Sequence, residues 1–87
     1  MKYQIRVHPG LEDDLKHLAK KDPACYERVK KKIRIIAENP GIGKPLRNIL
    51  RGLFRIHIGH FVMIYEFNEE TGVITLVKFA HHDQAYT

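Results

Sequence analysis

Residues 53–67 read Leu-Phe-Arg-Ile-His-Ile-Gly-His-Phe-Val-Met-Ile-Tyr-Glu-Phe, and this stretch decides the fold. Two alternating runs flank Gly59-His60, a pair that suits a two-residue type II′ hairpin turn with glycine first. The resulting register sets Ile58 opposite Phe61. One face of the hairpin is then apolar and is predicted to lie on the core. Its members are Phe54, Ile56, Ile58, Phe61, Met63 and Tyr65.

The opposite face of this hairpin carries Arg55 and His57 beside Val62 and Ile64. A cationic side chain and an imidazole two residues apart on a strand point in the same direction. Two interpretations remain open at this point. The face is either an ordinary solvated strand surface or a site for chemistry on a rigid element.

Size and composition narrow the class of protein. The 87 residues predict one domain, 1–87, with a modest core. A net charge of +5 and a pI near 9.5 favour a polyanionic partner, either nucleic acid or an acidic protein. A single cysteine, Cys25, excludes a disulfide framework. Without an apolar run near the ~20 residues that cross a bilayer, we expect a cytoplasmic protein with no membrane partner.

Upstream of the hairpin, alternation over residues 2–7 predicts a strand, and helical spacing predicts helices over 10–20 and 23–38. Asp22 is the expected N-cap of the second helix, with proline in its first turn. Residues 41–52 are typical of a connecting loop. The side chains expected to anchor this loop to the core are Leu46, Ile49 and Leu50.

Downstream, residues 68–72 predict a second hairpin turn and 73–80 a last strand. The tail that follows is irregular or forms one helical turn. Strict alternation in the last strand puts one set of side chains on one face, namely Ile74, Leu76, Lys78 and Ala80. The whole order predicts an α+β fold: an N-terminal strand, a two-helix hairpin, then an antiparallel three-stranded meander, with the first strand beside the meander in one sheet.

Histidines gather at two places, His57 and His60 around the hairpin turn and His81 and His82 after the last strand. Imidazole can give or take a proton near neutral pH. Interleaved cations can hold a phosphodiester, and the aromatic Tyr86 can stack on a base. The cations are Lys44, Arg47, Arg51, Arg55 and Lys78.

A zinc site is the alternative use of these histidines. It would combine residues 81–83 with His57 or His60. Adjacent residues on an extended chain point in opposite directions, so one ligand would be misdirected. We therefore expect no metal and no cofactor.

Several segments together resemble the RelE/ParE superfamily of type II toxin–antitoxin systems. They are Lys44-Pro45-Leu46, Gly52-Leu-Phe-Arg-Ile-His-Ile-Gly-His-Phe61, Ile64-Tyr65-Glu66 and Ala80-His81-His82-Asp83 followed by Tyr86. The resemblance covers nearly the whole chain. For RelE- and YafQ-type members it implies an endoribonuclease that cuts mRNA in the ribosomal A site, by attack of a 2′-hydroxyl on the adjacent phosphate. It also implies a cognate antitoxin as partner.

Carried over by position, the resemblance implies His82 as general acid and His57 as general base or phosphate contact. It implies Arg55 and Lys44 as phosphate clamps and Tyr86 as the aromatic that stacks on the target nucleotide. The further candidates for RNA or phosphate binding are Arg47, Arg51, His60 and Lys78.

The sequence departs from the family pattern at Val62, where many RelE-type chains have an arginine that contacts the scissile phosphate. ParE-type members share the fold, lack the ribonuclease residues and poison DNA gyrase. Val62 therefore keeps two alternatives open, a gyrase poison and a catalytically inactive binding protein. For the latter, the basic stretch Lys30–Lys32 suits an acidic antitoxin segment.

Overall fold

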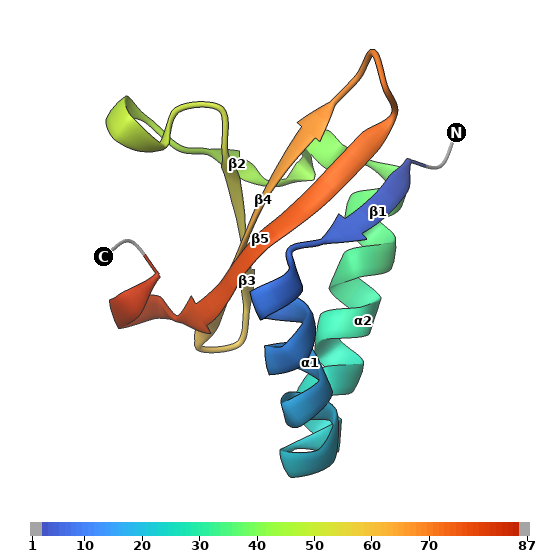
Figure 1. Ribbon diagram of the computed structural model, residues 1–87. Helices are drawn as coiled ribbons and strands as arrows, with labels where there is room; N and C mark the ends of the chain where they lie inside the picture. Colours follow the sequence, from blue (N-terminus) through green and yellow to red (C-terminus); the bar gives the residue numbers. More distant parts are fainter. Residues whose placement is uncertain (1–2, 86–87) are drawn as a thin grey trace.

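Five strands form one sheet in the order β1-β5-β4-β3-β2, and two helices cover one of its faces (Figure 1). The computed structural model describes residues 3–85. The main elements are β1 (Gln4–Val7), α1 (Pro9–Lys21), α2 (Pro23–Glu38), β2 (Lys44–Pro45), β3 (Phe54–Ile58), β4 (Phe61–Asn68) and β5 (Val73–His81). Single 3-10 turns lie at Pro40–Ile42, Asn48–Leu50 and His82–Gln84. The predicted α+β fold is confirmed, and β2 adds a short strand within the predicted loop.

The sheet is mixed because β1 runs parallel to β5, while the other neighbours are antiparallel. The first strand therefore returns beside the meander as predicted. In the central hairpin Ile58 pairs with Phe61, and Gly59 has φ +63°, a conformation that glycine adopts without strain. The predicted hairpin register is confirmed.

The second helix begins at the predicted residue, and α1 begins at Pro9, one residue before the predicted range. The Asp22 carboxylate accepts a hydrogen bond of 3.2 Å from the backbone N–H of Cys25, which satisfies one open donor of α2. Within residues 3–85, neither helix combines the length and apolar character needed to cross a membrane. The core fills the space between the helices and the sheet; its buried members are Leu11, Leu15, Val29, Ile36, Ile58, Met63, Tyr65, Ile74 and Leu76.

Tyr65 links this core to the start of β2. Its hydroxyl donates a 2.6 Å hydrogen bond to the carbonyl of Pro40 and accepts one of 2.9 Å from the N–H of Gly43. Both backbone groups belong to the turn that follows α2. The buried phenol therefore fixes where Lys44 joins the sheet edge.

The last strand departs from strict alternation. The pairing shifts between Ile64 and Tyr65, because Ile64 pairs with Lys78 while Tyr65 pairs with Leu76, which leaves Val77 as an extra residue. Such a bulge reverses the faces of everything beyond it. The prediction that Lys78 and Ala80 share a face with Leu76 is therefore wrong. Both lie on the face opposite the helices.

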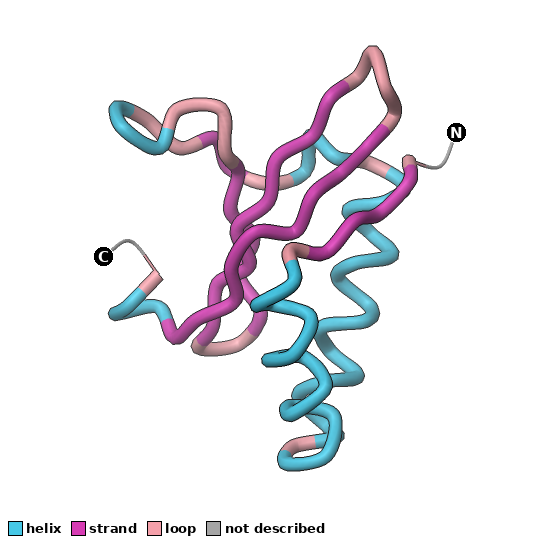
Figure 2. The backbone as a smooth tube through the Cα atoms, viewed as in Figure 1, coloured by secondary structure: helices cyan, strands magenta, loops and turns pink. Residues whose placement is uncertain are grey.

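Figure 2 shows the β2–β3 loop and the C-terminal turn projecting away from the helices. The loop is closed by backbone hydrogen bonds, among them Leu46 N–H to the Leu53 carbonyl at 2.9 Å. Its tip turns through Asn48, which has φ +59°. This turn directs Ile49 outward, so that it is 96% exposed. The expectation that Ile49 anchors the loop is wrong; Leu46 takes that place.

Candidate functional site

The sheet face opposite the helices has a small apolar cluster of its own. Val62 is fully buried and Ile64 is 3% exposed, beneath Ala85 of the tail. The partly buried side chains around them are Leu46, Leu53 and Ala80. This part of the face is therefore covered and is not a solvated strand surface.

The tail is held over this face by polar contacts as well. The backbone N–H of His82 donates to the carbonyl of His60 at 2.9 Å, and Nζ of Lys78 donates to the carbonyl of Gln84 at 3.3 Å. These contacts set the ring of His82 against that of His57, stacked with centroids 5.6 Å apart and planes 25° from parallel. Residues far apart in the sequence thus form one imidazole pair.

Arg55 is hydrogen-bonded to one member of this pair, His57, which lies on the same strand, β3. Its Nη1 lies 2.8 Å from Nε2 of His57. Arginine remains protonated in proteins and can only donate, so Nε2 is the acceptor. The neutral ring consequently carries its proton on Nδ1. A guanidinium donor thereby sets the tautomer and orientation of His57.

A basic hollow of about 400 Å³ lies beside the imidazole pair. Lys44 pairs with Arg55 across β2 and β3, and Arg47 follows on the loop. All three cations line the hollow together with Pro45 and Leu46. The sequence from 39 to 65 contains no acidic residue to oppose these charges. This arrangement offers cations for a phosphate next to groups that can move protons.

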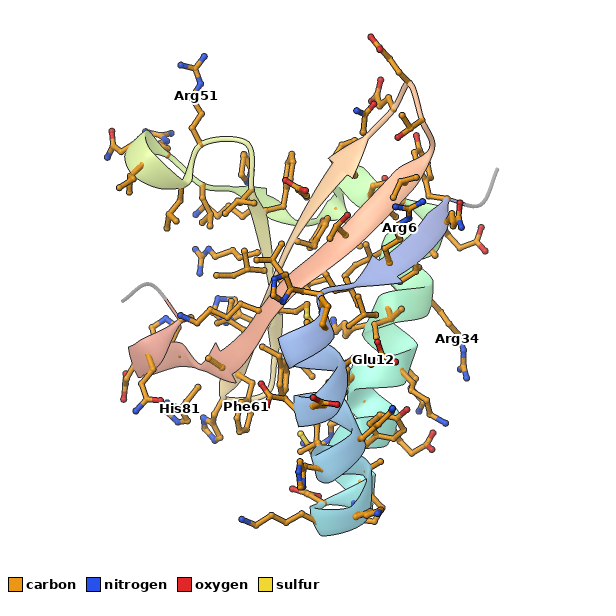
Figure 3. The ribbon with its side chains drawn as sticks, in the orientation of Figure 1. Arg6, Glu12, Arg34, Arg51, Phe61 and His81 are labelled. Carbon is orange, nitrogen blue, oxygen red and sulfur yellow. The ribbon has the colours of Figure 1, made fainter. Side chains whose placement is uncertain are left out.

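Other candidates lie apart from this cluster. Arg51 points away from the sheet at the end of the β2–β3 loop (Figure 3). His60 stacks on His81 with centroids 6.4 Å apart, and His81 also contacts the edge of Phe61 (Figure 3). Tyr86 lies outside the described residues.

Sequence reasoning missed how the tail is held in place. Ala85 and the Gln84 carbonyl do this through packing and one hydrogen bond, and neither residue type carries a chemical signal. The bulge at Val77, which turns Lys78 towards the tail, also has no marker such as glycine. In the part of the chain that the structure describes, no three histidine, cysteine, aspartate or glutamate side chains gather as metal ligands.

Comparison with known proteins identifies the class as toxins of type II toxin–antitoxin systems. The chain belongs to the ParE toxin family, whose model matches residues 5–86. RelE4 of Methanocaldococcus jannaschii is 34% identical over 97% of this chain and 90% of its own length. The predicted membership of the RelE/ParE superfamily is therefore confirmed.

Solved structures of this superfamily share the fold over nearly the whole chain. An archaeal RelE–RelB complex from Pyrococcus horikoshii is 25% identical, with a TM-score of 0.73, and the match covers 98% of this chain and 100% of that one. The toxin–antitoxin complex RelBE2 from Mycobacterium tuberculosis has a TM-score of 0.80 at 24% identity, with 94% and 100% covered.

Proposed function

We propose that this toxin is a ribosome-dependent endoribonuclease that cleaves mRNA. One observation carries the proposal: the stacked pair His57–His82 is joined through Arg55 to a hollow lined by cations. Proton transfer and charge neutralisation are what cleavage of an RNA phosphodiester requires when the RNA's own 2′-hydroxyl is the nucleophile.

The proposed chemistry is one in-line displacement. The 2′-oxygen attacks the adjacent phosphorus, and its proton passes to Nε2 of His57 as Arg55 turns from the ring to the phosphate. The bond from phosphorus to the 5′-oxygen breaks, and His82 gives its proton to that leaving oxygen. The products are a 2′,3′-cyclic phosphate and a 5′-hydroxyl. Lys44 and Arg47 neutralise the non-bridging oxygens.

The hydrogen bond within the site supports this assignment of acid and base. Nε2 of His57 accepts from Arg55, so this nitrogen carries no proton and suits the base. His82 is then the group left to supply the proton. The basic hollow is lined by five residues of β2, β3 and the loop between them and does not enclose an RNA strand, so we propose that the ribosome holds the strand in line for attack.

The same proposal includes a cognate antitoxin. The two solved structures described above are toxin–antitoxin complexes, and the net charge of +5 favours an acidic partner. Within the basic stretch of α2, Lys31 is exposed, whereas Lys30 pairs with Glu27 at 3.0 Å and lies over the ring of Tyr26. We therefore expect the stretch Lys30–Lys32 to contribute less to antitoxin binding than its three positive charges suggest. Co-purification of this protein with its cognate antitoxin tests the partnership.

The test of the activity is cleavage of a defined mRNA in a purified translation system, mapped by primer extension. Wild type, His82→Ala and the control His17→Ala are compared; His17 is exposed on α1. We expect cuts in the A-site codon with wild type and His17→Ala and none with His82→Ala. Intact mRNA at saturating wild-type protein would overturn the proposal.

DNA gyrase is the second candidate target, and Val62 favours it. This residue is buried beneath the tail, so no charge reaches the site from the position where many RelE-type chains have arginine. The matching family model is also that of ParE toxins. A supercoiling assay with purified gyrase tests this candidate. Inhibition by both wild type and His82→Ala would support gyrase, and inactivity in both assays would support an inactive binding protein.

A further inference from the structure

A second hollow, of about 440 Å³, lies on the sheet face opposite the helices. It is towards the β4–β5 turn, away from the tail, and Gly52 of the β2–β3 loop borders it. Its polar lining includes Arg6, Thr75 and Glu66. Pockets for small ligands commonly begin at about 300 Å³, so a nucleobase fits this volume.

The strand register sets opposite charges across this hollow. Arg6 pairs with Thr75, and Thr75 pairs with Glu66, so the three residues form one row across β1, β5 and β4. With strands ~4.8 Å apart, Arg6 and Glu66 stand about 10 Å from each other at the backbone. Figure 3 labels Arg6 on β1. A planar ring can therefore meet a guanidinium on one side and a carboxylate on the other.

The side chains of Arg6 and Glu66 do not form an ion pair with each other. Among residues 3–85 the ion pairs belong to the helices and the tail, and neither Arg6 nor Glu66 takes part. Asn68 is already engaged, since its Oδ1 accepts from the N–H groups of Glu70 and Thr71 in the turn. The hollow thus presents a donor and an acceptor that no ion pair among residues 3–85 uses.

A carboxylate such as that of Glu66 is not expected on a surface that binds only phosphates. Glu66 is the first acidic residue after Glu38, and it lies on the same sheet face as Arg55 and Lys78. A carboxylate repels phosphate oxygens, so it weakens backbone binding. It is suited instead to the N–H groups of a base edge.

We propose that this hollow binds a guanine of the RNA substrate, an inference that rests on the proposed ribonuclease function. Guanine carries two neighbouring donors, N1–H and the N2 amino group, which match the two oxygens of Glu66. Its other edge carries the acceptors O6 and N7, which match Arg6. Cytosine offers the carboxylate one amino group only, and adenine offers no pair of neighbouring donors.

The hollow is separate from the proposed point of cleavage. Val62, the partner of His57, and Glu66 are four residues apart on β4, about 13 Å at ~3.3 Å per residue. The guanine therefore belongs to a nucleotide other than the one whose 2′-hydroxyl attacks. Recognition at this distance selects the sequence around the cut without taking part in the chemistry.

Binding to uncleavable RNA tests the hollow without any need for activity. The probes are 2′-O-methyl uridine octamers with one central G, A, C or U, measured by fluorescence anisotropy at one fixed salt concentration. We expect the G octamer to bind wild type about tenfold more tightly than the others. Equal affinities, or a preference for C, would overturn the proposal.

The substitution Glu66→Gln is expected to change which base the hollow prefers. Glutamine keeps the size of the side chain and pairs with adenine N6 and N7, so the preference should move from G to A. The control is Glu69→Gln in the neighbouring turn, which should retain the preference for G. An unchanged preference in Glu66→Gln would overturn the proposal.

Sequencing of the cut sites in the translation system gives the second measurement. Wild type should cut near guanines, and the cuts made by Glu66→Gln should show adenine enriched at that position. Cleavage with the same base pattern in both proteins would overturn the guanine site alone. If wild type does not cut at all, the ribonuclease proposal fails, and the octamer affinities still decide what the hollow binds.

Discussion

Arg55 and His57 stand two residues apart on β3, and Nη1 of Arg55 donates a 2.8 Å hydrogen bond to Nε2 of His57. The same guanidinium lines the basic hollow with Lys44. One side chain thus connects the group proposed to accept a proton with the place proposed for the phosphate.

We predict that Arg55→Lys lowers mRNA cleavage by about 10- to 100-fold although it keeps the charge. Lysine lacks the planar fork that allows one side chain to meet both an imidazole and a phosphate. Initial rates in the translation system measure the effect. Arg34→Lys on the outer face of α2 is the matched control and should cut at the wild-type rate. Full activity of Arg55→Lys would mean that charge alone is required at this position.

The stacked pair leads to a second prediction. His57→Ala and His82→Ala should each lower the cleavage rate by roughly 10²–10⁴-fold. The double variant should cleave nearly as fast as the less active of the two single variants. Groups that act in one proton-transfer event lose their joint contribution when either is removed. Single-turnover rates of the four proteins complete the cycle. Multiplicative losses would instead indicate independent roles for the two histidines.

Much of the fold could be predicted because its signals are local. Alternation with a glycine turn specifies the central hairpin, and Asp22 with its proline specifies the start of α2. The bulge at Val77 has no such signal, because it depends on how β4 and β5 pair. Its consequence is large: without it, Lys78 would face the core.

The candidate site could be predicted in its residues but not in its arrangement. Six histidines and a basic loop were evident, yet only the fold brings His82 to His57 and leaves His60 with His81. The covering of Val62 by Ala85 depends on a long-range contact from the tail. A small apolar residue near a chain end gives no indication of this role.

Burial of Val62 leads to a third prediction. Val62→Arg should not restore an arginine to the site; it should displace the tail, lower the free energy of unfolding by about 3 kcal/mol and reduce cleavage. A cation without a partner is costly in a fully buried position. Urea unfolding and cleavage rates are measured beside Val62→Ile. Faster cleavage at an unchanged free energy of unfolding would contradict the prediction and show that the tail can be displaced at little cost.

Close packing at the start of β2 leads to a fourth prediction. Gly43→Ala should destabilise the protein by about 1–3 kcal/mol, since a Cβ there would overlap the hydroxyl of Tyr65 and approach the carbonyl oxygen of Arg55 to 2.9 Å. Gly41→Ala is the control, because its Cβ would meet no atom closer than Oδ1 of Asn39, at 3.6 Å. Equal unfolding free energies for the two variants would contradict the prediction.

Tyr65 makes stability depend on alkaline pH. Burial raises the pKa of its phenol above the ordinary value of 10.0, and the hydrogen bond from the Gly43 N–H opposes this to a smaller degree. The unfolded chain then loses this proton at lower pH than the folded chain. The contribution of the neutral phenol to stability is therefore complete below pH 10 and is lost as the pH rises through the folded pKa.

We accordingly predict two opposite effects of Tyr65→Phe. At pH 7 the variant should be about 1–3 kcal/mol less stable, because the Pro40 carbonyl and the Gly43 N–H lose their buried partner. Above pH 10 its stability should fall less steeply than that of wild type, because no phenol ionises on unfolding at this position. Urea unfolding from pH 7 to 11 measures both effects. Parallel curves for the two proteins would exclude Tyr65 as the source of the alkaline sensitivity.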